Sequence, residues 1–436
     1  MKKLIKIIVS AFFVCFSILS CQKDNIDSQQ IQTSNVNDLH VTSDVALEVS
    51  NNYFEISNTT SKSNSSRIGR DGKGLIDMKD KKVKSLKTFK DEKTQEELFH
   101  LFRYEGGGFS IISADKRMTP VLAFSESNDF ENEELAGIKE WIMATKMGIK
   151  KVKKDLKEPE EKDKRLWEIF LKQSKGGRVA VTCQPDQIFD TGRFVDAVAI
   201  WGQGGEYKFY SPTDNGCQCQ KKPAGCASVA MAMIMRYHQH PQTTMSFNGA
   251  SFVTNYPTMA RILSGSSCAL PSPESLQVAM LMRLCGGAAN SGYGVFGSCN
   301  TYTYPWNVDD GLSFMGFSNG GNSGSLSDQY NNLKSDLMNG FPVIFSGTQG
   351  MFNLNDWHIW VGDGYRSYRY EYAYTDPRTE ITRCISNKTE WIGMNWGWDG
   401  ECNGYFYAAY EFDTSQNGTN YGTYRSYLNV ITGIRK

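Results

Sequence analysis

In Pro223-Ala-Gly-Cys-Ala-Ser-Val-Ala-Met-Ala-Met-Ile-Met-Arg-Tyr-His238, a glycine turn runs directly into an apolar helical segment. This pattern predicts a central helix that begins at Cys226. Unpaired backbone N–H groups and a partial positive charge at a helix N-terminus lower the pKa of a cysteine placed there. Cys226 is therefore predicted to be a reactive thiolate and a catalytic nucleophile.

A nucleophilic thiol needs a general base, and the chain has five histidines. Two of them lie in an N-terminal region that we expect to be removed. His238 and His240 follow Cys226 on the same helix at roughly 18–21 Å along its axis, too far to reach the thiol. The remaining residue, His358, lies in the alternating apolar segment Asp356-Trp-His-Ile-Trp-Val-Gly-Asp-Gly-Tyr365, which is typical of a strand. Cys226 and His358 form the predicted dyad.

Two further segments supply groups that such a dyad needs. In Gly393-Met-Asn-Trp-Gly-Trp-Asp-Gly400, Asn395 offers an amide that can hold an imidazole, and two tryptophans offer aromatic cover. In Trp201-Gly-Gln-Gly-Gly-Glu-Tyr207, the Gln203 amide offers an N–H donor for an oxyanion. Together these segments predict a site for acyl transfer.

In this order the four segments resemble the streptopain family, the papain-like cysteine peptidases of streptococci and Bacteroides-type bacteria. Residues 106–124 resemble the inhibitory propeptide of that family, and the resemblance covers most of residues 45–436. It implies an α+β fold, in which a papain-like peptidase domain follows a small α+β inhibitory propeptide domain. It also implies an endopeptidase made as a zymogen, which hydrolyses peptide bonds through an acyl-thioenzyme.

The resemblance assigns a role to individual residues of this chain. It implies Cys226 as nucleophile, His358 as base, Gln203 as oxyanion-hole donor, Asn395 and Trp396 as supports of the histidine, and Gly225, Trp357 and Trp398 as substrate-binding residues. One position departs from the pattern, because the family often has glycine directly before the histidine, where this chain has Trp357. This departure concerns the shape of a subsite rather than the chemistry.

The amino-acid composition changes between the N-terminal and the C-terminal part of the chain. Residues 134–178 are dense in Lys and Glu, whereas Gly, Tyr and Trp dominate after residue 200, so we expect a junction near residues 175–193. The basic segment 172–178 offers a cleavable connection. We predict a signal peptide at 1–20, a tether at 21–44, a propeptide domain at 45–180 and a catalytic domain at 181–436. A permanent binding domain in place of the propeptide remains the alternative.

The N-terminus reads as an export signal. A basic start is followed by an apolar core too short to span a membrane, and the ending Ile18-Leu-Ser-Cys21 resembles a lipobox with Cys21 as the lipidated residue. We therefore expect an exported outer-membrane or cell-surface lipoprotein, with release after maturation left open. A plain signal peptide that happens to contain Cys21 is the alternative.

Lys+Arg and Asp+Glu both number 47, a balance that favours neither nucleic acid nor an acidic ligand. We expect protein or peptide substrates, the chain's own propeptide as inhibitor, a dedicated protein inhibitor as a further candidate partner, and membrane contact only through the lipid anchor. No cofactor and no metal are expected. The glycine-rich residues 286–297 lack the context of a phosphate-binding loop and are predicted to line the cleft.

Besides Cys15, Cys21 and Cys226, the chain has eight cysteines, for which disulfides are the default in an exported protein. Their pairing cannot be deduced from the sequence. A zinc site built from Cys217, Cys219, His238 and His240 is an alternative, although the one-residue spacers are shorter than those of usual zinc sites. Cleavage before Cys183 would avoid an odd thiol.

Two functions from other classes remain open at this point. A surface lipoprotein that has lost activity would share the signal and the propeptide-like domain, but it predicts erosion at Cys226, His358 or Gln203, and all three are present. A Cys–His acyltransferase or amidase shares the chemistry, but the Asp orienter that such enzymes use is matched less well than Asn395-Trp396.

Overall fold

A computed structural model describes residues 39–60, 78, 81–172, 182–242, 244–247, 250–295, 299–347, 357–408 and 428–436. The predicted signal peptide, Cys21 and most of the predicted cleavable segment 172–178 lie outside these residues. Within the described part of the chain, no helix is both long enough and apolar enough to cross a membrane.

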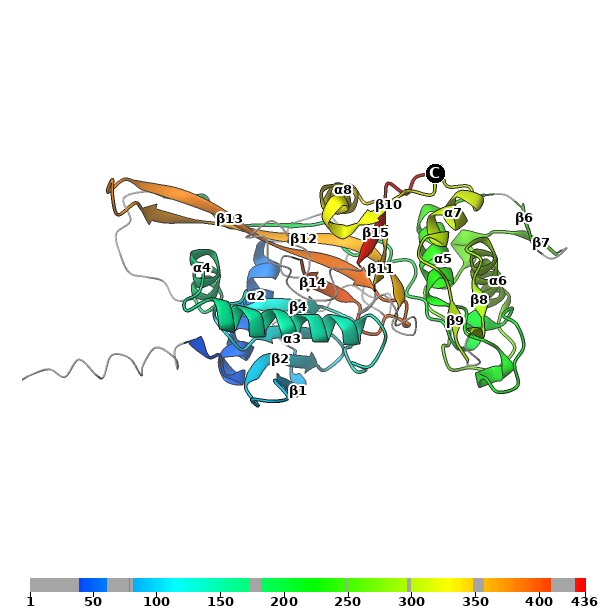
Figure 1. Cartoon of the computed structure of the whole chain (residues 1–436), viewed down its shortest axis with the longest axis horizontal. Coiled ribbons are helices and arrows are strands. Elements are labelled where there is room, and N and C mark those ends of the chain that lie inside the picture. The colour runs from blue at the N-terminus through cyan, green and yellow to red at the C-terminus, as the bar shows by residue number, and fades with distance from the viewer. Residues whose placement is uncertain are drawn as a thin grey trace, which may run out of the picture. The chain divides into compact units, whose positions relative to one another are not determined.

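The chain is α+β, as predicted, and its strands form one large sheet with helices packed around it (Figure 1). The α-helices are α2 (Ser43–Thr60), α3 (Ile138–Asp155), α4 (Glu161–Phe170), α5 (Cys226–His238), α6 (Pro273–Ala288), α7 (Asn307–Phe314) and α8 (Leu326–Met338). Short 3₁₀ turns are η2 (Gly205–Lys208), η3 (Gln218–Gln220) and η4 (Tyr256–Thr258).

The sheet has eleven strands, ten of them in the order β1-β2-β3-β4-β14-β13-β12-β11-β15-β10, with β5 paired to β12. Its strands are β1 (Val83–Lys90), β2 (Glu97–Tyr104), β3 (Phe109–Ser113), β4 (Val121–Ser125), β5 (Gln187–Asp190), β10 (Asn322–Ser325), β11 (Val343–Gly347), β12 (His358–Thr375), β13 (Thr382–Asn395), β14 (Gly404–Tyr407) and β15 (Asn429–Thr432). Two small hairpins pair β6 (Thr244–Phe247) with β7 (Ala250–Val253) and β8 (Gly292–Tyr293) with β9 (Thr301–Tyr302).

The N-terminal part is the small α+β unit that the sequence predicts. Strands β1 to β4 form an antiparallel meander, and α2, α3 and α4 pack their apolar faces on it. Folded structure already begins by residue 39, because the Val41 N–H donates to the Ala114 carbonyl and the Lys116 N–H donates to the Leu39 carbonyl. The predicted tether at 21–44 therefore extends too far toward the C-terminus, and residues 39–44 belong to this unit.

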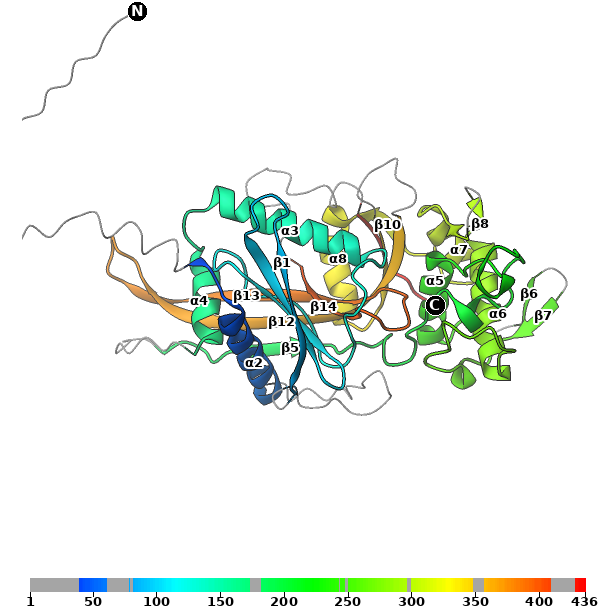
Figure 2. The ribbon, with the colours of Figure 1, turned by 90° about the horizontal axis from the view of Figure 1, so that it is seen from below.

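The C-terminal part combines helices with the rest of the sheet. Helices α5, α6 and α7 gather beyond β11, at the opposite end from the tip of the β12–β13 hairpin (Figures 1 and 2). Helix α5 is buried along most of its length, as its run of Ala, Met, Val and Ile requires. It packs on α6 and on β12, so the first turn of α5 faces the first residues of β12.

The two parts share one sheet, because β4 pairs with β14 through Phe124 opposite Tyr405 and Ala123 opposite Phe406. One apolar core then spans both parts. Tyr53 and Phe124 from the N-terminal part pack against Trp391 and Tyr405, with ring centroids 5.3–5.8 Å apart. The buried Arg366 of β12 pairs with Glu126 at 3.1 Å across the same boundary.

Three disulfides fix the C-terminal part: Cys183–Cys384, Cys217–Cys299 and Cys219–Cys268. The zinc alternative is wrong, because Cys217 and Cys219 are bonded to other cysteines rather than available as thiolate ligands. Cys285 and Cys402 are buried free thiols. Six of the eight cysteines are thus paired, so the expectation of disulfides is correct for those six and wrong for Cys285 and Cys402.

Candidate active site

Cys226 occupies the position that the sequence predicts, as the first residue of α5. The preceding Gly225 has a φ of +94°, and a Cβ there would lie 2.7 Å from the Thr301 methyl group. Only glycine meets both conditions without strain. The backbone N–H groups of Ile359, Ala227 and Cys226 lie near the thiol and favour its thiolate form. Since Ile359 directly follows His358, this contact places the thiol beside the predicted base.

His358 is the first residue of β12, and its imidazole is 2 % exposed. Its Nε2 lies 2.8 Å from the Trp396 carbonyl oxygen. A carbonyl can only accept, so Nε2 carries the hydrogen and, in the neutral ring, Nδ1 is left as the acceptor. The ring lies between Trp398 and Trp360 in near-parallel stacks, with centroids 5.3 and 5.9 Å away.

The N-terminal part covers this histidine. The chain just before α3 runs over the imidazole, and a Cβ on Gly137 would lie 2.7 Å from His358 Cδ2 and 2.8 Å from the Trp396 ring. The indole Nε1 of Trp398 donates to the Ala136 carbonyl at 3.1 Å. The Gly137 N–H in turn donates to the Glu140 carboxylate at 2.5 Å. A backbone without side chain therefore fills the space in front of the base.

Burial keeps both members of the dyad uncharged in this form of the chain. It lowers the pKa of His358 to about 4, against the opposing effect of the Trp396 carbonyl. It also raises the pKa of the Cys226 thiol, although the N–H groups of Ile359, Ala227 and Cys226 favour the thiolate. The prediction of a lowered thiol pKa is therefore wrong for the full chain, because desolvation outweighs the helix N-terminus.

Asn395, the predicted support of the imidazole, is fully buried and bonded elsewhere. Its Nδ2 donates to Asp196 Oδ1 at 3.1 Å and to the Ala199 carbonyl at 3.0 Å, and its Oδ1 accepts from the Gly397 N–H at 3.3 Å. Within the described residues, the group that bonds the imidazole is the Trp396 backbone. In this form Asn395 acts on the turn that carries Trp396 rather than on the ring.

The other predicted residues lie around the dyad. The Gln203 carbonyl accepts from the Ala224 N–H at 3.0 Å, which brings the predicted oxyanion donor beside the turn that leads into Cys226. The Trp396 ring packs on Trp360 and is buried, while Trp357 is half-buried. Residues 286–288 end α6, and the following hairpin brings Thr301 against Gly225.

Sequence reasoning missed three residues of this site. Trp360 follows His358 by two positions on β12 and so shares its face of the strand, a signal that the alternation of the segment already contained. Asp196 and Asn403 hold the turn that carries Asn395 and Trp396, and nothing in their local sequence marks them.

Comparisons with known proteins agree with this architecture. Residues 201–406 match the Peptidase C10 family, and residues 38–149 match the Spi protease inhibitor family. Streptopain of Streptococcus pyogenes serotype M1 is 21 % identical over 373 residues, which are 77 % of this chain and 80 % of streptopain.

One solved structure shows the same fold over most of this chain. A fragment of prointerpain A from Prevotella intermedia, carrying a cysteine-to-alanine mutation, matches with a TM-score of 0.51 and 19 % identity. The match covers 81 % of this chain and 99 % of that fragment. Active interpain A matches at 19 % identity with a TM-score of 0.39, over 57 % of this chain and 96 % of that chain.

A thiol at a helix N-terminus beside a strand histidine, covered by a preceding domain of its own chain, defines a cysteine peptidase zymogen. Residues 201–406 form a Peptidase C10 domain, and the chain is therefore a cysteine endopeptidase of the streptopain type. Its N-terminal domain is the inhibitory propeptide, which precedes the peptidase domain as in prointerpain A. The predicted fold, family and enzyme class are therefore confirmed.

Proposed function

We propose that Cys226 is the nucleophile and His358 the general base of this endopeptidase. The observation that carries the proposal is the placement of the thiol at the start of α5, in contact with the N–H of Ile359 next to the histidine. The bond from His358 Nε2 to the Trp396 carbonyl supports it, because Nδ1 is then the nitrogen available for the thiol proton.

In the mature enzyme His358 takes the Cys226 proton, and the resulting thiolate attacks the carbonyl carbon of the scissile peptide. Gln203 and the Cys226 N–H donate to the oxyanion that forms. The imidazolium then gives its proton to the leaving amine as the C–N bond breaks, which leaves a thioester. Water, deprotonated by His358, attacks that thioester and releases the acid and the thiol.

Latency follows from the backbone at Ala136 and Gly137, which occupies the space over His358 and Trp398. A substrate cannot approach the base while that backbone is present, and the buried imidazole stays neutral. Trp357, Trp398 and Gly225 become substrate contacts when the propeptide leaves. We place the activating cleavage before Cys183, because its disulfide to Cys384 ties the chain from that point on to β13.

The full chain is exported and anchored through a lipid on Cys21 in this proposal, with the lipobox-like sequence as its support. A dedicated inhibitor protein fits the same surface as the propeptide. A lipid label that is lost in Cys21→Ala tests the anchor independently of the catalytic assignment. A label retained by the variant would contradict it.

The test of the catalytic assignment is intact mass of residues 22–436 before and after incubation with a thiol-directed epoxide inhibitor. Wild type is expected to trim itself and to bind one inhibitor, and Cys226→Ala is expected to do neither. Cys285→Ala is the matched control, because this buried free cysteine lies between α6 and α5. Casein cleavage by Cys226→Ala would overturn the assignment.

A further inference from the structure

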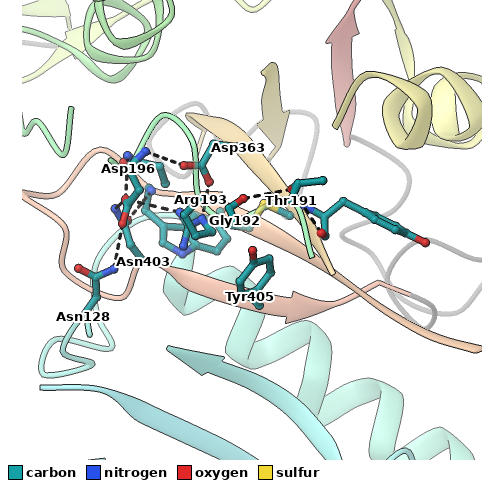
Figure 3. A network of polar contacts seen from close by, with 12 residues as sticks. Asn128, Thr191, Gly192, Arg193, Asp196, Asp363, Asn403 and Tyr405 are labelled. Carbon is teal, nitrogen blue, oxygen red and sulfur yellow. Dashed lines mark hydrogen bonds and ion pairs between the residues drawn. The ribbon is translucent and has the colours of Figure 1, made fainter. Parts of the chain in front are cut away.

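A buried polar cluster includes Asp196, Asn403 and Asn128 (Figure 3). Its centre is the carboxylate of Asp196, in the loop after β5, which is 4 % exposed. Asp196 Oδ1 accepts from Asn403 Nδ2 at 2.6 Å and from Asn395 Nδ2 at 3.1 Å. Asp196 Oδ2 accepts from Asn128 of the propeptide domain at 3.1 Å.

The cluster reaches His358 through one peptide group. Asn403 Oδ1 accepts from the Trp396 N–H at 2.9 Å, and the Trp396 carbonyl accepts from His358 Nε2 at 2.8 Å. Asn403 thus bonds the backbone N–H of Trp396, and the backbone carbonyl of Trp396 bonds the imidazole. The orientation of the base depends on where that backbone lies.

Asp196 is itself fixed to the strand that carries the histidine. Its backbone N–H donates to Asp363 Oδ2 at 2.8 Å, and Asp363, on β12, pairs with Arg193 at 2.5 Å. Asn403 and Asn395 are both fully buried. Hydrogen bonds between buried polar groups hold one geometry, because breaking any of them leaves a desolvated donor or acceptor unpaired.

We propose that Asp196 and Asn403 are positioning residues for His358 in the peptidase reaction, acting through the Trp396 backbone. Asp196 orients the Asn403 amide so that its oxygen faces the Trp396 N–H, and that bond sets the carbonyl that holds Nε2. The proposal rests on His358 being the base. It gives the reaction two further required side chains on segments far from the dyad in sequence.

The first test compares Asn403→Ala, Asn403→Asp, Asp196→Asn and the double variant Asp196→Asn/Asn403→Asp in the full chain, each matured by added wild-type enzyme. kcat/KM for a peptide substrate is divided by the number of sites that the epoxide inhibitor labels. Asn403→Ala is expected to lose on the order of 100-fold, the effect of a misplaced catalytic group. Asn403→Asp loses as much, because two carboxylates then face each other at hydrogen-bond distance.

Asp196→Asn costs less, about 10-fold, because its amide oxygen still accepts from Asn403. The double variant is expected to have a kcat/KM about 10-fold higher than that of Asn403→Asp alone, because the amide at position 196 can donate to the carboxylate at position 403. The matched control is Asp336→Asn in α8. This carboxylate is also buried, but it bonds Gly433 and Arg435, so wild-type kcat/KM per labelled site is expected.

The pH profile separates positioning from simple stability. In the double variant a charged acceptor faces the Trp396 N–H and polarises its carbonyl, so the alkaline limb of kcat/KM, where imidazolium is lost, moves to higher pH. The limb stays in place in Asp336→Asn. An unchanged kcat/KM in Asn403→Ala, no gain from adding Asp196→Asn, or an unmoved limb in the double variant would each overturn the proposal.

A failure of the catalytic assignment can be distinguished from a failure of this proposal. Turnover by His358→Ala would remove the assigned base, whatever Asn403 does. An inactive His358→Ala beside a fully active Asn403→Ala would leave the base intact and remove only the positioning role. If Asn403→Asp does not fold, Asn403→Ala and the double variant carry the test, because neither brings two carboxylates together.

Discussion

The propeptide meets the peptidase domain in two places that differ in size and in chemistry. Along β4 and β14 the contact is broad and aromatic, with Tyr53 and Phe124 packed on Trp391 and Tyr405. Over His358 the contact is narrow and consists mainly of backbone at Ala136 and Gly137. We expect the broad contact to supply affinity and the narrow contact to supply inhibition.

The largest expected effect comes from breaking the broad contact with Phe124→Ala. Phe124 is fully buried among four aromatic rings and the Arg366 guanidinium, which lies 5.0 Å from its centroid. Removing its ring should lower the free energy of unfolding of the full chain by about 3–5 kcal/mol. Denaturant unfolding of the Cys226→Ala precursor measures it. A loss below about 1 kcal/mol would show that the affinity lies elsewhere.

The next effect is a pH dependence at another contact between the two domains, where α4 packs against β12. Asp163 on α4 is buried with one unpartnered oxygen, close to Tyr370 of β12, and burial raises its pKa to about 7. The native chain therefore holds a proton that the unfolded chain releases near pH 4. Its contribution to stability is full below about pH 4, falls as the pH rises to 7, and levels off above that value.

Asp163→Asn should remove this slope. At pH 8 the variant is expected to be more stable than its parent by about 2–4 kcal/mol, at 1.36 kcal/mol per unit of pKa shift, and at pH 4 the two should be equal. Unfolding free energies at the two pH values measure the effect. Equal stability of parent and variant at pH 8 would contradict it.

For Gly137→Ala we expect a smaller effect on stability than for the two preceding variants, but a larger effect on the latency of the precursor. The new Cβ would meet the His358 and Trp396 rings, and the φ of +85° disfavours any residue but glycine. We expect a loss of about 1–3 kcal/mol together with peptide hydrolysis by the uncleaved precursor. Gly148→Ala in α3 is the control, because nothing lies near its Cβ. A latent Gly137→Ala precursor would place inhibition outside the narrow contact.

The smallest effect is expected from the loss of one hydrogen bond in the narrow contact. Trp398→Phe removes the indole N–H that donates to Ala136 but keeps an aromatic ring beside the imidazole. The loss should be about 1 kcal/mol, or about five-fold more residual activity of the precursor. Active-site labelling of the precursor measures it, and Trp357→Phe, which replaces the half-buried neighbour of His358, serves as comparison.

The sequence predicts the helix that begins at Cys226, the strand that carries His358 and the neighbourhood of the dyad, because these follow from local periodicity and from a glycine turn. The strand is predicted over residues 356–365, whereas β12 runs from His358 to Thr375 and pairs with β13. An irregularity in their pairing between Gly362 and Gly364 lets β12 continue where the pattern breaks. The pairing of β4 with β14 joins distant segments, which no local pattern records.

The chemistry of the site is predictable only in part, for the same reason. The helix N-terminus at Cys226 is visible in the sequence, but the desolvation that overrides it comes from tertiary packing. Asn395 stands out through its tryptophan neighbours. Asp196 and Asn403 do not, because their partners are brought together only by the fold.

The pairing of β4 with β14 also determines which strand the mature enzyme exposes after cleavage. In the precursor β14 is an interior strand, and once the propeptide leaves it becomes an edge, with backbone groups open to any extended chain. Two residue pairs with β4 are all that hold it in the sheet on that side. In the precursor β14 is covered, whereas in the mature enzyme its exposed edge can pair with other extended chains. Self-association through this strand is therefore expected only after activation.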